Sequence, residues 1–289
     1  MEKHLLVTIS DDPGALNGVR FIADFFSHPE SLRLTFFYTA SRPAEGDEVE
    51  EDQVVPLICG QGKDLILPHE SLEKVRQLLC GRGFGEGSMD VKIVFRRYTK
   101  ILDSILEGEK GLYDVVVLEP RGLSWLEEAF GGSVSRRVLE ETAGAPLWIC
   151  CDIDEARKNV LLCVDGSPSS LTMADHVGFM LQGERRHRVM LLIVTDPKDE
   201  AGAQAMAAME SAQAALMDNG FPEELVDAKV VSSGAVAQAI FSEAEEGNYA
   251  VVAMGRTGVG LGRSPGLFMG SASDYLYQHL RGAALWVCR

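Results

Sequence analysis

An internal repeat constrains the fold of this chain more than any other feature of its sequence. The segment APLWIC at residues 145–150 recurs as AALWVC at residues 283–288, which is 138 residues further on. Near the start, LLVTIS at residues 5–10 resembles VLLCVD at residues 160–165, at an offset of 155. A repeat of this length within 289 residues predicts two domains of similar fold.

The first copy is the longer of the two. The fall in offset from 155 to 138 means that it carries about 17 extra residues. We place them at residues 42–62, where the acidic run EGDEVEED indicates a solvated surface insertion. The polar stretch DIDEARK at residues 152–158 separates the copies, so we predict domains at residues 1–152 and 158–289.

Short apolar runs rich in β-branched residues alternate with helical patterns in both copies. Alternation of this kind predicts parallel sheets that are covered by helices on both faces. A strong helix is expected at residues 200–219, ended by Gly220. Each copy is therefore predicted to be a doubly wound, five-stranded α/β domain. The expected strands are residues 4–9, 32–38, 91–95, 115–118 and 147–150 in the first copy, and 160–164, 189–195, 228–231, 251–254 and 285–288 in the second.

Composition and charge exclude several classes of function. A net charge of −16 disfavours nucleic acid, whose phosphates require Lys and Arg surfaces. The N-terminus lacks the apolar run of a signal peptide, and no run approaches the roughly 18 apolar residues of a membrane helix. We therefore predict a cytoplasmic protein, with its six cysteines reduced. The histidines show no metal-binding spacing, so no metal site is expected in the protein itself.

A glycine-rich loop between a strand and a helix is the strongest functional signal. An apolar run at residues 251–254 leads directly into the segment GRTGVGLGRSPG, and Gly270-Ser271 then opens an amphipathic helix. Glycines allow consecutive backbone N–H groups to converge on an anion, and a helix N-terminus adds further donors. Ser271 and Ser273 supply hydroxyl groups, while Arg256 and Arg263 supply cations. The alternative is a surface loop in which Ser271 is an ordinary helix N-cap.

This pattern resembles that of the universal stress protein family. Nucleotide-binding members of that family carry G-x-x-G and then G-[ST] after the fourth strand, with an Asp at the end of the first strand. Here Gly255-x-x-Gly258 and Gly270-Ser271 match, and Asp165 ends the first strand. Eleven residues separate the two glycine pairs, slightly more than is typical of the family. The resemblance covers both copies, so it implies a tandem universal stress protein with the adenine nucleotide α-hydrolase-like fold and strand order 3-2-1-4-5.

The resemblance also implies a role for each matching residue. Asp165 is expected to contact ribose, and the backbone of Val194 is expected to meet adenine. The strand order places the ends of the first and fourth strands beside the point where ligands bind in open α/β sheets. The implied ligand is ATP or AMP, with Mg²⁺ bound through the phosphates. The residues expected to line the cleft or hold phosphate are Met254, Gly255, Thr257, Gly258, Gly270, Ser271, Ala272 and Ser273.

The first copy has lost part of this pattern. Glu119 stands in the place of the first glycine, Pro120 removes an N–H donor, and Ser10 replaces the first-strand Asp. Gly132-Ser133 remains at the family spacing. We therefore expect this copy to be a degenerate, structural domain.

Pairing of the two domains is a further implication of the resemblance. Domains of that family pair through their fifth strands, which here run from Leu147 to Cys150 and from Leu285 to Cys288. Pairing would cover two sheet edges that otherwise invite aggregation. The expected product is a pseudo-dimer within one chain.

Three functions remain open at this point. The first is a regulatory protein without catalytic residues that binds ATP or AMP in its second domain and acts on an unknown protein partner. The second is an interaction module that binds no nucleotide. The third is an ATP-cleaving enzyme of a related fold, for which the sequence offers no additional motif. The chain contains no P-loop, and the G-x-S-x-G pattern around Ser264 does not directly follow a strand, as a hydrolase nucleophile would.

Overall fold

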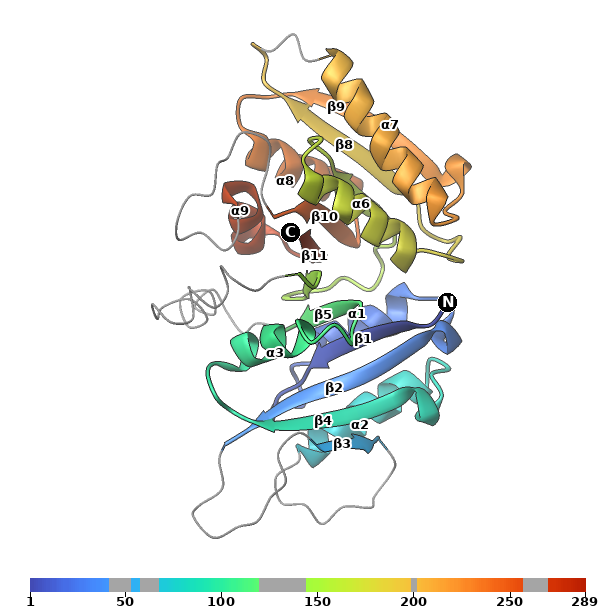
Figure 1. The fold of residues 1–289 in the computed structure, drawn as a ribbon, viewed down its shortest axis with the longest axis vertical. Coiled ribbons are helices and arrows are strands. Elements are labelled where there is room, and N and C mark those ends of the chain that lie inside the picture. The colour runs from blue at the N-terminus through green and yellow to red at the C-terminus, as the bar shows by residue number, and fades with distance from the viewer. Residues whose placement is uncertain (42–52, 58–67, 120–143, 199–201, 257–269) are drawn as a thin grey trace. The chain divides into compact units, whose positions relative to one another are not determined.

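The computed structural model describes residues 1–41, 53–57, 68–119, 144–198, 202–256 and 270–289 (Figure 1). The chain divides into two compact units, Met1–Ala145 and Pro146–Arg289. Strands and helices alternate in each unit, so the α/β class predicted from the sequence is confirmed. The division falls before residues 147–152, which the repeat assigns to the first copy. No helix in the described part of the chain is long and apolar enough to cross a membrane.

A mostly parallel sheet forms the centre of the first unit. Its strand order is β3–β4–β2–β1–β5, with β3 antiparallel to β4 and the other neighbours parallel. Gly18 and Gly108, on different helices, contact the side chains of Val117 and Val116 respectively. Since successive strand residues point to opposite faces, α1 and α3 cover opposite faces of this sheet. The elements are β1 (Lys3–Thr8), α1 (Asn17–Phe25), η1 (Pro29–Ser31), β2 (Leu32–Ala40), β3 (Gln53–Pro56), α2 (His69–Cys80), η2 (Glu86–Ser88), β4 (Met89–Phe95), α3 (Lys100–Gly108) and β5 (Val115–Leu118).

The insertion of the first copy contributes a strand that the sequence analysis missed. We expected residues 42–62 to form only a solvated surface segment, but β3 lies within them and places Val55 opposite Val91 of β4. Leu57 follows β3, is buried, and donates its N–H to the carbonyl oxygen of Met89 at 2.9 Å. An apolar run as short as Val54-Val55 between acidic and polar segments gives no periodic signal, which explains the error.

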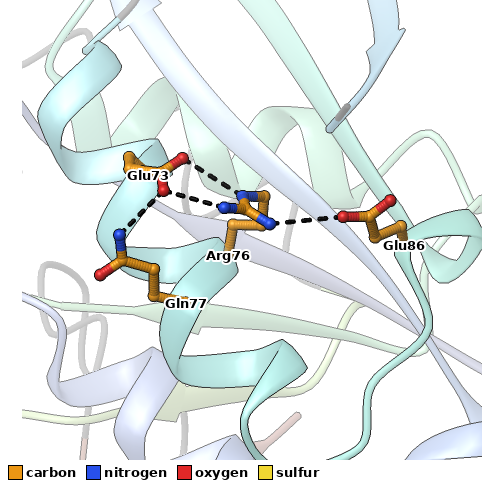
Figure 2. Close-up of polar contacts among 4 residues, drawn as sticks. All are labelled: Glu73, Arg76, Gln77 and Glu86. Carbon is orange, nitrogen blue, oxygen red and sulfur yellow. Dashed lines mark hydrogen bonds and ion pairs between the residues drawn. The ribbon is translucent and has the colours of Figure 1, made fainter. Parts of the chain in front are cut away.

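Helix α2 carries a polar network on its outer side (Figure 2). Arg76 donates from Nη2 and Nε to the Glu73 carboxylate at 2.9 and 3.2 Å, and its Nη1 lies 3.4 Å from Glu86 of η2. Gln77 donates from Nε2 to Glu73 at 2.8 Å. Contacts of this kind stabilise a helix by only a few tenths of a kcal/mol each, roughly 0.2–0.5. The network therefore orients the turn before β4 more than it stabilises the unit.

The second unit contains a parallel sheet with the order β9–β8–β7–β10–β11. The strands of its centre are almost wholly buried, as the apolar runs predict. The predicted helix at residues 200–219 is observed as α7. The elements are β6 (Leu147–Ile149), β7 (Val160–Cys163), α6 (Pro168–Met180), β8 (Val189–Thr195), α7 (Gly202–Asp218), η3 (Glu223–Leu225), β9 (Val226–Ser232), α8 (Val236–Gly247), β10 (Val251–Gly255), α9 (Ser271–His279) and β11 (Ala284–Cys288).

Strand β6 pairs with β11 inside the second unit. The pairing is antiparallel and places Trp148 opposite Trp286, with the two rings stacked at a centroid distance of 4.0 Å. Both rings are fully buried, and Nε1 of Trp148 donates to Nε2 of His176 on α6 at 3.1 Å. Burial lowers the pKa of His176 to about 3, so this imidazole is neutral. The two segments expected at a domain interface thus pair, while the pseudo-dimer itself stays a prediction.

A strand-to-helix ion pair recurs in the two units and extends the repeat. In the first unit Nζ of Lys92 on β4 lies 2.7 Å from Glu107 on α3. In the second, Nζ of Lys229 on β9 lies 2.5 Å from Glu243 on α8. The registers of the two sheets also agree. Lys92 pairs with a residue of β2, Lys229 pairs with a residue of β8, and these two partners occupy equivalent positions along their strands. Strands β4 and β9 are therefore structural counterparts.

Candidate functional site

A pocket of about 420 Å³ opens at the carboxyl edge of the second unit's sheet. The ends of β7, β8 and β10, one side of α7 and α8, and the first turn of α9 form its walls. Strands β8 and β10 lie on either side of β7, so the direction in which successive strands are added to the sheet reverses at β7. This is the switch point at which open α/β sheets bind ligands. Its position agrees with the site predicted from the sequence.

Eight of the ten residues predicted for the site line this pocket. Four come from strand ends, namely Asp165, Val194, Met254 and Gly255. Four come from the start of α9, namely Gly270, Ser271, Ala272 and Ser273. The remaining two, Thr257 and Gly258, lie outside the described residues. The structure therefore brings together segments that are separated by about 15 to 60 residues in sequence.

An apolar wall completes the pocket, and the sequence analysis did not find it. The cavity is also lined by Ala205 and Ala208 of α7 and by Val236 and Ile240 of α8. These residues follow no motif, and apolar side chains on an amphipathic helix usually indicate core packing. The only signal available was the high alanine content of α7, which leaves room beside the sheet.

Asp165 is held in place by its own turn. Its Oδ1 accepts hydrogen bonds from the backbone N–H and the hydroxyl of Ser167 at 3.0 and 2.6 Å. Ser167 in turn is the N-cap of α6 and accepts from the N–H of Ser170 at 3.2 Å. Gly166, at φ +78°, takes the left-handed conformation that this turn requires. The Asp165 side chain, which is exposed and lines the pocket, is therefore positioned by contacts within its own turn.

Gly255 is required for packing, independently of any ligand. A Cβ atom at this position would lie 2.6 Å from Oγ of Ser169 and 2.7 Å from the backbone nitrogen of Ser170. The end of β10 thus lies directly against the first turn of α6. The sequence analysis attributed this glycine to close approach of a ligand, and the structure adds a second reason for its presence.

The N-terminus of α9 is open toward the pocket. Its N-cap is Gly270, which has no side chain and makes no capping hydrogen bond. The alternative in which Ser271 is the N-cap is therefore wrong, because Ser271 is the first helical residue and is exposed. Ser273 is buried and donates its hydroxyl to the carbonyl oxygen of Gly270 at 3.0 Å. A helix start without a capping side chain leaves N–H donors for solvent or for a ligand.

A contact between strand end and helix start fixes the position of α9. Gly270 donates its N–H to the carbonyl oxygen of Arg256 at 3.0 Å, and Arg256 donates its N–H to Cys288 of β11 at 2.6 Å. A Cβ atom on Gly270 would lie 2.8 Å from that carbonyl of Arg256. The pocket thus combines a positive helix terminus with an arginine on its rim.

The other charged and titratable groups of the pocket are engaged or neutral. Asp196, after β8, accepts the N–H of Lys198 at 2.9 Å. Burial raises the pKa of the Cys163 thiol, and Asp165 and Glu243 raise it further, so Cys163 contributes a neutral wall. The arrangement suits a ligand with an anionic end and a flat, apolar end.

In the first unit Glu119 and Asp11, which follows Ser10 at the place of Asp165, make contacts within the unit. Glu119, at the place of Gly255, accepts the N–H of Asn17 and so caps α1, whose N-cap Leu16 makes no side-chain cap. Asp11 accepts a hydrogen bond from the hydroxyl of Tyr38 and lies 3.6 Å from Nζ of Lys100. Pro120 and Gly132-Ser133 lie outside the described residues, so the degeneracy of this copy stays a prediction.

Comparison with known proteins agrees with the fold of both units. Residues 156–285 match the model of the Universal stress protein family. The crystal structure of a universal stress protein from Archaeoglobus fulgidus DSM 4304 is similar over 99% of this chain and 96% of that chain, at 14% identity and a TM-score of 0.60.

A functionally unknown protein from Pseudomonas aeruginosa PAO1 is similar over 99% of this chain and 92% of its own, at 14% identity and a TM-score of 0.57. At such identities the likeness shows the fold alone. A comparison with curated proteins finds no match.

Proposed function

We propose that the second unit binds an adenine nucleotide, ATP or AMP, in this pocket and that binding serves regulation rather than catalysis. The main support for the proposal is that the predicted site residues lie around the same pocket. Residues chosen from the glycine motif and from the resemblance it supports, at strand ends and at a helix start, line one cavity of about 420 Å³. That volume lies within the roughly 300–1,000 Å³ of small-molecule sites. The match of residues 156–285 to the Universal stress protein family supports it.

The geometry suggests which part of the nucleotide each wall receives. The phosphates would lie at the open N-terminus of α9, near Arg256, where donors and the helix dipole favour negative charge. The carboxylate of Asp165 would accept the ribose hydroxyls. Adenine would lie against the apolar wall, with its polar edge at the backbone of Val194. Mg²⁺ would be bound by the phosphates of the nucleotide.

We expect any hydrolysis of ATP to be slow. A general base must reach the attacking water, and in this proposal Asp165 is assigned to the ribose, with no further catalytic motif beside the start of α9 in the sequence. Binding would order the pocket rim and so change the surface offered to a protein partner. A cytoplasmic location is part of the same proposal.

Replacement of Ser271 provides a test that spares the fold. Ser271→Glu places a carboxylate at the first helical position, where it repels phosphate but favours the helix dipole. We expect ATP binding, measured by isothermal titration calorimetry, to weaken at least about tenfold. Ser271→Gln is the matched control, because it adds similar bulk without charge, and it should bind nearly as well as the parent.

Two results would overturn the proposal. One is a parent chain that retains no nucleotide at millimolar concentration in equilibrium dialysis. The other is a Ser271→Glu variant that binds ATP as tightly as Ser271→Gln. Mass spectrometry of nucleotide released from freshly purified protein would then distinguish ATP from AMP.

A further inference from the structure

The counterpart strands β4 and β9 end their sheets in different ways. In the first unit, β3 covers the outer edge of β4 as an antiparallel strand. In the second unit, β9 is the outermost strand and pairs with β8 alone among the described residues (Figure 1). Burial differs accordingly, since most residues of β4 are buried or half-buried and most residues of β9 are exposed. The first copy of the repeat thus shows that an antiparallel strand can cover the edge that is exposed on β9.

The outer edge of β9 offers backbone groups and apolar side chains together. Ser233 donates its N–H to the carbonyl oxygen of Thr195 on β8 at 2.9 Å. Residues of a strand alternate in the side toward which their backbone groups point, so odd-numbered β9 residues bond to β8. Val226, Ala228 and Val230 therefore direct their N–H and C=O groups outward. The side chain of Val230 is 53% exposed, which is unusual for valine in a strand.

The first unit confirms this alternation at the counterpart edge. Leu57 donates its N–H to the carbonyl oxygen of Met89, and Val55 lies opposite Val91. The positions of Met89 and Val91 along β4 are equivalent to those of Val226 and Ala228 along β9. An antiparallel strand therefore fits an edge of this shape, with Ala228 as one of its pairing residues.

We propose that β9 pairs antiparallel with β9 of a second copy of this chain, with the two-fold axis at Ala228. This register places Val226 opposite Val230 on both sides of the axis. It also places Asp227 opposite Lys229, an attractive pair that occurs twice. A shift of the axis by one residue would place Lys229 opposite Lys229, which is repulsive. The strand is thus complementary to itself in charge in one register.

Charges next to the strand extend this complementarity. Asp227 is bonded to Arg188, the residue before β8, whose Nε and Nη2 each lie 2.9 Å from its carboxylate. Lys229 is bonded to Glu243 on α8. Pairing at Ala228 would therefore form a row of four charged side chains of alternating sign. Arg188 and Asp227 would come from one copy, and Lys229 and Glu243 from the other. Each cation would have carboxylates as its nearest charged neighbours.

Sedimentation velocity on the full chain tests the proposal. The parent should show a reversible dimer over a roughly hundredfold range of concentration at physiological salt. Ala228→Pro removes an N–H that points outward, so no bond to β8 is lost, and we expect the dimer dissociation constant to rise at least about tenfold. Ala228→Val keeps that N–H and is the matched control, which should dimerise like the parent.

Hydrogen exchange of the parent gives a second measurement that does not depend on any variant. Amides of Val226, Ala228 and Val230 should exchange more slowly at high than at low protein concentration. A parent that remains monomeric, an Ala228→Pro variant that dimerises as well as Ala228→Val, or a dimer without added protection in β9 would each overturn the proposal. If Ala228→Pro fails to fold, the exchange result alone decides.

Discussion

Gly255 shows that a glycine in a binding motif can be fixed by packing. Its missing Cβ allows β10 to contact Ser169 and Ser170 at the start of α6, the helix that follows Asp165. The same contact therefore sets the distance between two walls of the pocket. A variant at this position would change the stability of the unit together with any ligand affinity.

We predict that Gly255→Ala lowers the free energy of unfolding of the second unit by about 1–3 kcal/mol, because the added methyl group meets backbone at 2.7 Å. Urea denaturation followed by the fluorescence of Trp148 and Trp286 would measure this. Gly234→Ala is the control, since nothing lies within 4 Å of a Cβ placed there. Equal midpoints for the two variants would contradict the packing role.

His176 gives a prediction about pH. Its pKa is about 3 in the folded unit, against 6.5 for the unperturbed side chain, because burial penalises its charged form. Below pH 6.5 the unfolded chain therefore binds a proton that the folded unit does not. Stability should be complete above that pH and fall as the pH drops toward 3, with a slope that approaches about 1.4 kcal/mol per pH unit.

Comparison with His176→Gln isolates this contribution. The glutamine side chain can still accept the hydrogen bond from Nε1 of Trp148, but it does not titrate. We expect urea midpoints of the parent to fall more steeply than those of the variant between about pH 7 and pH 5. Parallel curves would show that His176 is protonated without cost.

Among elements, the strand-to-helix ion pairs of the two copies differ in burial. Lys92 and Glu107 are 9% and 3% exposed, whereas Lys229 is 44% exposed beside Glu243. We predict that Glu107→Gln destabilises the first unit by about 3 kcal/mol, since it leaves Lys92 buried with a neutral partner. Glu243→Gln should cost clearly less, because Lys229 remains hydrated. Chemical denaturation of both variants would measure the difference, and equal losses would contradict it.

The sequence predicted most strands because buried parallel strands are nearly all apolar, and that signal is local. The resemblance to a known family supplied the site residues, and eight of them line the pocket because strand ends and a helix start meet at the switch point of such a sheet. The sequence analysis missed β3, the apolar wall at Ala208 and Ile240, and the capping role of Glu119. Each of these depends on a partner distant in sequence, such as Asn17 for Glu119, and no local period reports such contacts.

At the scale of the whole molecule, the two copies differ at the outer edge of the sheet, at the end of the fourth strand of the repeat, and just after its first strand. One copy closes its outer edge with β3, caps its first helix with Glu119, and binds Asp11 to Tyr38 and Lys100. In the other copy β9 pairs with β8 alone among the described residues, Gly255 stands in the place of Glu119, and Asp165 accepts hydrogen bonds from Ser167 in its own turn. The proposed nucleotide site therefore belongs to one copy, while the other copy makes contacts within its own unit near the equivalent positions.

This division predicts that a nucleotide stabilises one unit only. A ligand that binds the folded state at about 100 times its dissociation constant adds about 2.7 kcal/mol to the free energy of unfolding. With ATP at that level, hydrogen exchange followed by mass spectrometry should slow by the matching factor of about 100 in β7, β8 and β10, while β1, β2 and β4 stay unchanged. Ser271→Glu should reduce the factor to about 10 or less at the same ATP concentration, and equal protection of both units would mean that the first copy also binds the nucleotide.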